Sequence, residues 1–134
     1  MKLSRFFIFL TLFAAGSAAL APSVASAQIP PPRITAPGEV EEFRGVDSLE
    51  VRWDEEYGAE KYHIVLARDR KFRRIFFEDR NVAGSFLELA NLDYGIYFLR
   101  IRSIGDRGKR GDWSETRAFV ITPTPPTTIT GSIP

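Results

Sequence analysis

Short stretches of alternating apolar and polar residues recur between residues 34 and 121. Successive side chains of a β-strand point to opposite faces, so this period of two predicts strands buried on one face. Glycine and other turn residues separate the stretches, and no long window has the period of a helix. The predicted strands are 34–40, 49–53, 62–66, 75–77, 86–89, 96–104 and 117–121. Seven strands in about 90 residues predict an all-β fold, a seven-stranded antiparallel β-sandwich.

The alternation also assigns each side chain to a face of its predicted strand. On the strand 62–66, Tyr62, Ile64 and Leu66 share the inner face. His63 points the opposite way, so we expect a histidine on the exposed surface. The predicted structural core is Trp53, Tyr62, Leu66, Tyr97, Leu99 and Ile101.

The first 27 residues have a different pattern. Lys2 and Arg5 precede an apolar run over 6–21, and the small residues Ala25, Ser26 and Ala27 follow it. This is the pattern of a secretory signal peptide, and the run is shorter than the roughly 20 residues that span a bilayer as a helix. The sequence predicts cleavage after Ala27, a periplasmic or secreted protein, and no transmembrane segment in the cleaved chain.

Proline marks the two ends of the remaining chain. Residues 28–36 include three consecutive prolines, which favour an extended leader because proline fixes φ and removes a backbone donor. Residues 122–134 are rich in Thr and Pro and carry no charge, so we expect a disordered tail. The predicted domain is therefore 37–121.

Composition limits the chemistry of the domain. The full chain has 18 Lys and Arg residues, 17 Asp and Glu residues, one His and no Cys. Losing Lys2 and Arg5 with the signal peptide leaves one more acid than base. The near-neutral charge and the predicted export argue against nucleic acid as a partner. Without cysteine, a disulfide is impossible, and the fold depends on its apolar core.

Candidate catalytic and metal-binding groups are sparse. His63 is the single imidazole, and there is no thiol to act as a nucleophile. Asp54, Glu55 and Glu56 are consecutive, which is unlike the alternating ligand spacing of a calcium loop. We therefore expect no enzymatic activity, no metal and no cofactor.

Several of these residues match a known class of domain. Trp53 on the second predicted strand, Tyr62 on the third and Tyr97 on the sixth are similar to positions of the fibronectin type III-like domains. More narrowly, the stretches 58–62, 67–69, 95–97, 100–104 and 111–114 resemble the variant found in bacterial envelope proteins related to the FecR regulators.

The resemblance implies how the aromatic residues and the strands are arranged. Tyr97 matches the tyrosine whose hydroxyl turns back to the backbone just upstream while its ring packs in the core. Trp53 matches the central core residue. The first, second and fifth strands would form one sheet, and the third, fourth, sixth and seventh strands the other.

The charges are segregated along the chain. From residue 39 to 60 there are nine acids against two arginines, whereas 61–74 and 100–110 are strongly basic. On the implied sheets we expect one acidic and one basic sheet. The basic sheet would raise the local concentration of an anionic partner, although at physiological salt its charges are screened beyond about 8 Å.

The outer face of the basic sheet is the predicted binding surface. Arginine beside an exposed aromatic side chain is typical of interfaces. The candidate residues are His63, Val65, Phe98, Arg100 and Arg102 on adjacent strands, with Arg70, Lys71, Arg73 and Arg74 at the rim. The predicted function is an exported, non-catalytic interaction module of the bacterial cell envelope that binds a protein partner. Binding of an anionic glycan or lipid headgroup is the alternative.

One tripeptide invites a different interpretation. Arg110-Gly111-Asp112 has the sequence that binds integrins when it stands before the last strand of a fibronectin type III module. Gly111 and the following Trp113 also fit the turn pattern of the family, and a tripeptide alone is weak evidence. We expect Trp113 to cover one end of the sandwich.

Overall fold

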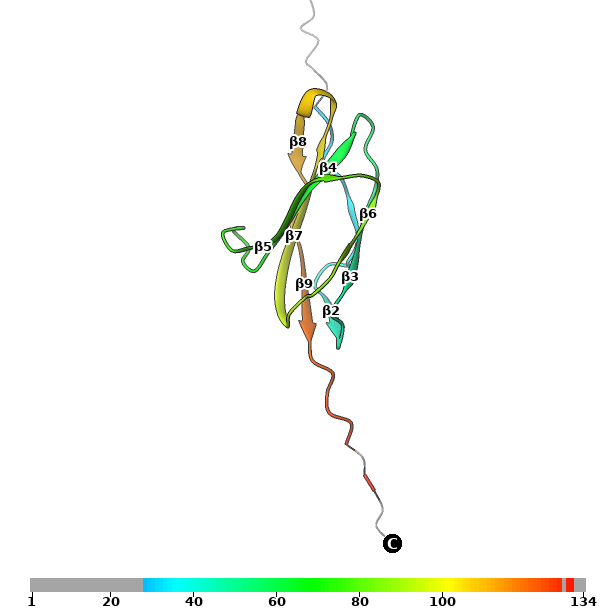
Figure 1. Ribbon diagram of the computed structural model, residues 1–134, viewed down its shortest axis with the longest axis vertical. Coiled ribbons are helices and arrows are strands. Elements are labelled where there is room, and N and C mark those ends of the chain that lie inside the picture. The colour runs from blue at the N-terminus through cyan, green and yellow to red at the C-terminus, as the bar shows by residue number, and fades with distance from the viewer. Residues whose placement is uncertain (1–27, 129, 132–134) are drawn as a thin grey trace, which may run out of the picture.

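The protein is a sandwich of two β-sheets, which confirms the predicted fold class (Figure 1). The structure is a computed structural model that describes residues 28–128, 130 and 131, so the predicted signal peptide lies outside the described residues. The strands are β1 (Ile34–Ala36), β2 (Glu41–Arg44), β3 (Leu49–Trp53), β4 (Lys61–Ala67), β5 (Ile75–Val82), β6 (Phe86–Leu89), β7 (Gly95–Ile104), β8 (Arg110–Trp113) and β9 (Arg117–Thr122).

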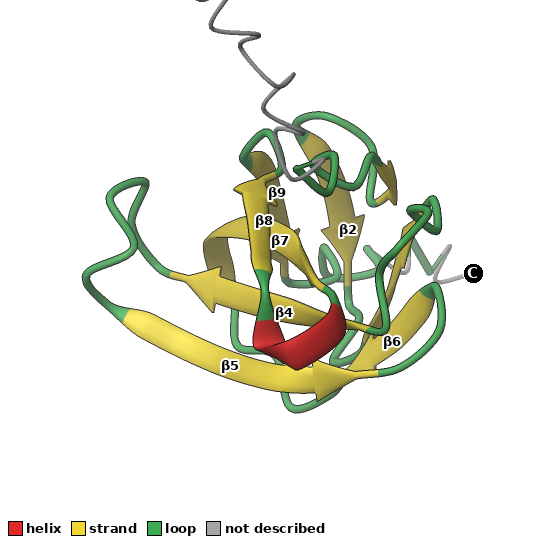
Figure 2. Cartoon of the chain, turned by 90° about the horizontal axis from the view of Figure 1, so that it is seen from above, coloured by secondary structure: helices red, strands yellow, loops and turns green. Residues whose placement is uncertain are grey.

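The two sheets divide the seven predicted strands as the resemblance implied, but the larger sheet also has β2 and β8, which the sequence did not predict. The smaller sheet has the order β1-β3-β6, and the larger has the order β2-β9-β7-β4-β5, with β8 also paired to β7. Every pair is antiparallel except β2 and β9, which run parallel. Figure 2 shows β5 curving along the edge of the larger sheet beside β4, with the loop between them extending away from the body.

The prediction of one strand over 34–40 is wrong. Pro37 is buried and has no backbone N–H to continue a ladder, so the chain leaves the smaller sheet after β1. It then joins the larger sheet as β2. Glu41 and Glu42 therefore lie on the larger sheet, and the expected division into one acidic and one basic sheet is incomplete.

Aromatic rings fill the space between the sheets. Tyr97 is stacked on Phe119 with ring centroids 5.3 Å apart, and Trp53 meets Tyr62 edge to face at the same separation. The Tyr97 hydroxyl donates a hydrogen bond of 2.9 Å to the carbonyl of Asp93. Such edge and offset contacts stabilise a core beyond the area that they bury. The six predicted core residues are all buried: Trp53, Tyr62, Leu66, Tyr97, Leu99 and Ile101.

The proline-rich segment before β1 packs on the domain. Ile29 and Pro32 are buried, and Gln28 Nε2 donates a hydrogen bond of 3.0 Å to Asp112 on β8. A Cβ added to Gly111 would stand 2.8 Å from the carbonyl oxygen of Ile29. Only glycine therefore lets this segment approach β8 so closely.

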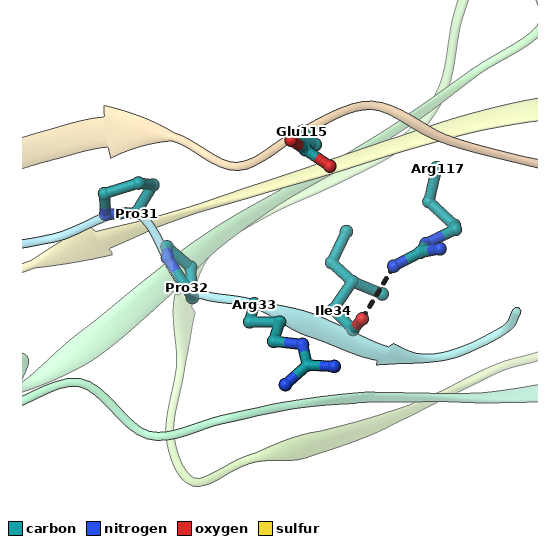
Figure 3. Close-up of a pocket in the computed structure, with 6 residues that line it drawn as sticks. All are labelled: Pro31, Pro32, Arg33, Ile34, Glu115 and Arg117. Atoms are coloured by element: carbon teal, nitrogen blue, oxygen red, sulfur yellow. Dashed lines mark hydrogen bonds between the residues drawn. The ribbon is translucent and has the colours of Figure 1, made fainter. Parts of the chain in front are cut away.

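A pocket of about 350 Å³ lies between this segment and the start of β9 (Figure 3). Its lining residues are Pro31, Pro32, Arg33, Ile34, Glu115 and Arg117. Arg117 donates a hydrogen bond of 2.8 Å to the Ile34 carbonyl, so its guanidinium ties β1 to β9. The one helical element of the described residues is the 3-10 turn Asp106–Gly108, and nothing in that part of the chain has the length and hydropathy of a membrane-spanning helix.

Candidate functional site

The outer face of the larger sheet brings five of the predicted binding residues together. In the register of β4 and β7, His63 lies opposite Arg102, Val65 opposite Arg100, and Ala67 opposite Phe98. Paired residues of adjacent strands point to the same face, so the alternation placed these side chains correctly relative to one another. They form a surface on the side of the sheet that faces away from the core.

The expectation of an exposed His63 is wrong. The exposed fraction of His63 is 3%, and that of Val65 is also 3%. Both side chains therefore lie beneath the other residues of this face and cannot contact a partner directly. The cause is Trp113 on β8, which pairs with Arg102 and lies with its ring 4.9 Å from the imidazole. Trp113 therefore lies on this sheet face and not, as predicted, over one end of the sandwich.

A chain of hydrogen bonds fixes the state of His63. Arg102 Nε donates to His63 Nδ1 at 3.1 Å, so Nδ1 carries no hydrogen and Nε2 carries the one of a neutral ring. His63 Nε2 then donates to Glu78 Oε1 at 2.7 Å, and Arg80 Nη2 donates to the same oxygen at 3.0 Å. Burial lowers the pKa of His63, although the Glu78 contact opposes this effect. The histidine is thus a neutral link between Arg102 and Glu78.

Arginine and aromatic side chains alternate above this floor. The Arg100 guanidinium carbon lies 4.1 Å from the ring centroids of both Phe72 and Trp113, and that of Arg102 lies 4.3 Å from Trp113. Cations at such distances are attracted to the ring faces. We call the following residues the arginine–aromatic cluster: Arg70, Phe72, Phe98, Arg100, Arg102 and Trp113.

The loop between β4 and β5 contributes Arg70 and Phe72 to the cluster. Asp69 holds the loop in shape, since its carboxylate accepts hydrogen bonds from the backbone N–H of Arg73 at 3.0 Å and of Arg74 at 2.7 Å. These bonds, chiefly the one from Arg74, lower the pKa of Asp69. Phe72 adopts a left-handed φ of 54° within this turn. Figure 1 shows the loop projecting on the side of the molecule away from β3 and β6.

The predicted rim residues have different positions. Arg70 stacks on Phe98, with 5.2 Å between its guanidinium carbon and the ring centroid. Lys71 and Arg73 are exposed on the loop. Arg74 bonds instead to the backbone carbonyl of Arg68 at 3.3 Å and does not reach the cluster. The sequence predicted that all four basic residues of the loop lie near the outer face of the larger sheet. Only the geometry of the turn shows that Arg70 contacts the cluster and that Arg74 bonds elsewhere.

The cluster holds more positive charge than its surroundings neutralise. Burial lowers the pKa of Arg102, and three neighbouring cations lower it further, namely Arg110, Arg100 and Arg80. Burial also lowers the pKa of Arg100. Glu78 opposes the shift at both arginines. Within the described part of the chain, the terminal nitrogens of Arg100 and Arg102 donate no hydrogen bond, and Arg100 Nε is buried without a partner.

Sequence reasoning missed Phe72, Glu78 and Arg80 as members of this site. Phe72 lies in a loop of basic residues, and its contact with Arg100 depends on the turn that Asp69 stabilises. Glu78 and Arg80 lie beyond residue 77, where the predicted strand ended. Their alternation with Asp79 along β5 was a weak signal, because an edge strand can be polar on both faces.

The tripeptide Arg110-Gly111-Asp112 is part of β8 rather than of a projecting loop. Gly111 is buried, and Asp112 accepts a hydrogen bond from Gln28. The segment before β1 therefore contacts the tripeptide directly. For metals, the described residues contain no group of three or more His, Cys, Asp or Glu side chains placed to share an ion.

Comparison with known proteins identifies the fold. No family model matches the chain, and no curated protein sequence matches it. Among solved structures, the fibronectin(III)-like modules of Clostridium thermocellum CbhA are 12% identical with a TM-score of 0.51, covering 68% of this chain and 94% of the module. FN3tt is 19% identical with a TM-score of 0.51, covering 72% of this chain and 98% of its own.

A third similar structure is an Fn3-like protein from Clostridium thermocellum, 10% identical with a TM-score of 0.50, covering 71% of this chain and 92% of that one. Each match spans nearly the whole solved module but only part of this chain. At these identities the similarity establishes a fibronectin type III-like fold alone. Functional conclusions depend on the residues of the site itself.

Proposed function

We propose that the protein is an exported, non-catalytic interaction module of the bacterial cell envelope, of the type found in FecR-related envelope proteins. It binds an anionic protein partner on the arginine–aromatic cluster. The observation that carries this proposal is the unneutralised charge at Arg100 and Arg102, whose terminal nitrogens have no hydrogen-bond partner among the described residues. A carboxylate from a partner would supply both the charge and the acceptors.

The geometry supports a binding role because both arginines are held in place before a partner arrives. Arg100 lies between two rings, and Arg102 is bonded to the buried His63. Side chains that are ordered in the free protein lose less conformational entropy on binding. Arginine and tryptophan are also the residue types most enriched among the residues that dominate interface energies.

A protein partner is favoured over a glycan or a lipid headgroup by the apolar residues beside the cluster. Ile96 on β7 is 56% exposed, and it lies opposite the half-buried Val120 of β9. A phosphate or carboxylate group of a glycan or lipid headgroup would pair with the arginines, but it has no apolar part that could cover these side chains. A folded or extended protein segment could cover both the cationic and the apolar parts.

Export is supported by the N-terminal pattern of 1–27, which predicts cleavage before Gln28. Every described strand follows that position, so the cleaved chain retains the whole sandwich. The charge difference between the cluster and its partner would act over about 8 Å at physiological salt. Binding in the periplasm or outside the cell should therefore weaken as salt increases.

The test is retention of the chain beginning at Gln28 on separated envelope fractions, namely membrane proteins, lipopolysaccharide or other anionic polymer, and cell-wall sacculi. We expect salt-sensitive retention on the protein fraction, which the double variant Arg100→Gln/Arg102→Gln loses. Retention on protein-free polymer would instead indicate the glycan or lipid alternative. Equal retention of the parent and the double variant would contradict the proposal.

A matched control separates the site from general charge. Arg33 and Arg52 are exposed arginines of the N-terminal segment and the smaller sheet, away from the cluster. The variant Arg33→Gln/Arg52→Gln changes the net charge by the same amount and should be retained like the parent. Thermal unfolding of both double variants establishes that each is folded before the retention is compared.

A further inference from the structure

The outer face of β7 has an ordered row of four side chains. Ile96 and Phe98 come first, followed by Arg100 and Arg102, each separated by one residue that points into the core. Along an antiparallel strand, alternate residues are about 6.8 Å apart. The row is thus two apolar positions and two cationic positions at a regular spacing.

The row has different borders on its two sides. On the β4 side, the loop carries Arg70 over Phe98 and Phe72 over Arg100. On the other side, Trp113 of β8 contacts both arginines. Further along, Val120 and Ala118 of β9 lie opposite Ile96 and Phe98 and extend the apolar part.

The spacing of the row equals that of an extended polypeptide. We infer that the partner contributes an extended segment with carboxylates on two alternate residues and apolar side chains on the next two alternate positions. The carboxylates pair with Arg100 and Arg102, and the apolar side chains cover Ile96 and Phe98. This inference rests on the proposed function and adds the chemistry and the conformation of the bound segment.

The hydrogen-bonding capacity of the two arginines fits this occupant. Arg102 Nε is occupied by His63, and Arg100 Nε is buried, so each guanidinium presents its two terminal nitrogens. Two such nitrogens match the two oxygens of one carboxylate in a bidentate pair. Arg100 and Arg102 are two residues apart on the same strand, so their guanidinium groups match two carboxylates at positions i and i+2 of an extended chain. A helix would place its neighbouring carboxylates at i and i+3 or i+4 instead.

Synthetic peptides test the inference directly with the chain beginning at Gln28. The probe has Glu at positions 1 and 3 and Ile at positions 5 and 7, with Ser between them, and a second probe has the reverse order so that either strand direction is covered. One control peptide has the same composition with the two Glu residues adjacent. Another has Glu and Ile at helical spacing. Binding is measured by calorimetry and by the change in tryptophan fluorescence, to which Trp113 at the cluster and Trp53 in the core both contribute.

We expect one of the alternating probes to bind about 10-fold more tightly than either control, since the adjacent or helical spacing loses one charge-assisted pair. Arg100→Gln should weaken the alternating probe by a similar factor. Ile96→Ser should weaken it less, and Phe86→Ser should have no effect, because Phe86 is as exposed as Ile96 but lies on the smaller sheet.

The outcomes distinguish this inference from the proposed function. If all acidic peptides bind equally and binding still requires Arg100, the extended segment is wrong while the anionic partner stands. Tighter binding of the helical peptide would also overturn it. If no peptide binds but the chain is retained on the protein fraction, the occupant is not an extended segment. If neither occurs, both proposals fail.

Discussion

Arg102 donates a hydrogen bond from Nε to Nδ1 of His63, its partner across the strand pair, at 3.1 Å. This bond requires a neutral imidazole with its hydrogen on Nε2, and Nε2 donates that hydrogen in a hydrogen bond to the Glu78 carboxylate. If His63 gains a proton, Nδ1 becomes a donor that faces the donor of Arg102. The bond is then lost, and two positive charges lie in contact.

We expect the stability of the protein to decrease as the pH falls below about 6.5. Burial lowers the pKa of His63 below its usual 6.5 in the folded state, so the unfolded chain gains its proton first. Stability therefore increases with pH across this window and is fully present above it. Melting temperatures between pH 8 and pH 5 measure the effect, and an NMR titration of His63, the single histidine of the chain, gives its folded pKa.

The variant His63→Gln is the control for this pH dependence. It retains a polar side chain at the position but cannot be protonated, so its melting temperature should be flat over the same window. Glu78 does not confuse the result, because its hydrogen bonds to His63 and Arg80 lower its pKa from 4.5, and its contribution is lost only below that pH. If the melting temperature fell with pH equally in the parent and in His63→Gln, His63 would not be the group that causes the pH dependence.

Trp113→Ala should destabilise the protein by about 2–4 kcal/mol, because it removes a large ring that covers His63 and contacts two arginines. Trp113→Phe keeps an aromatic face and should cost clearly less. With alanine at 113, water reaches His63, and its pKa should rise toward 6.5. Urea unfolding measures the first effect, and the histidine titration measures the second. An unchanged pKa would mean that Trp113 does not control the burial of His63.

The sequence pattern predicted the sandwich well wherever burial alternates along one strand. On β3 and over residues 99–102 of β7, the residues that face the core are apolar and their neighbours are polar, so position alone gives the face. The pattern also placed His63 on the outer face of β4. It could not predict that His63 is buried there, because the cover is Trp113, which is distant in sequence.

The strand that carries Trp113 has no signal of its own. Residues 110–113 contain a glycine and two charged residues, and β8 exists because it pairs with β7. In the same way, the contact of Phe72 with Arg100 depends on a turn that Asp69 stabilises through backbone bonds. The break between β1 and β2 was visible as Pro37, but the change of sheet depends on partners that are not local in sequence.

Tyr97→Phe should cost about 1 kcal/mol of stability, the usual contribution of one hydrogen bond. The change removes the 2.9 Å bond to the Asp93 carbonyl and leaves the ring stacked on Phe119. Tyr57→Phe is the matched control, because Tyr57 is 99% exposed and loss of its hydroxyl should not change the stability detectably. Urea unfolding of the two variants gives the comparison. Identical midpoints for the parent and Tyr97→Phe would show that the hydroxyl contributes nothing to stability.

Gly111→Ala should displace the segment before β1, at a cost of about 1–3 kcal/mol. The added Cβ would stand 2.8 Å from the carbonyl oxygen and 3.3 Å from the Cβ of Ile29, and a backbone atom cannot move away without moving the segment. Gly131→Ala is the control, since a Cβ there meets nothing within 4 Å. Urea unfolding of the two variants measures the difference, and only the first should be less stable than the parent.

A double-mutant comparison identifies the contact that causes the effect. In a chain that lacks residues 28–30, the carbonyl of Ile29 is absent, and Gly111→Ala should then cost almost nothing further. Coupling of this kind between two changes is expected only for groups in contact. If the substitution costs as much in the shortened chain as in the parent, the strain lies elsewhere. The neighbouring carbonyl of Ser103, 3.5 Å from the added Cβ, would then be the group to examine.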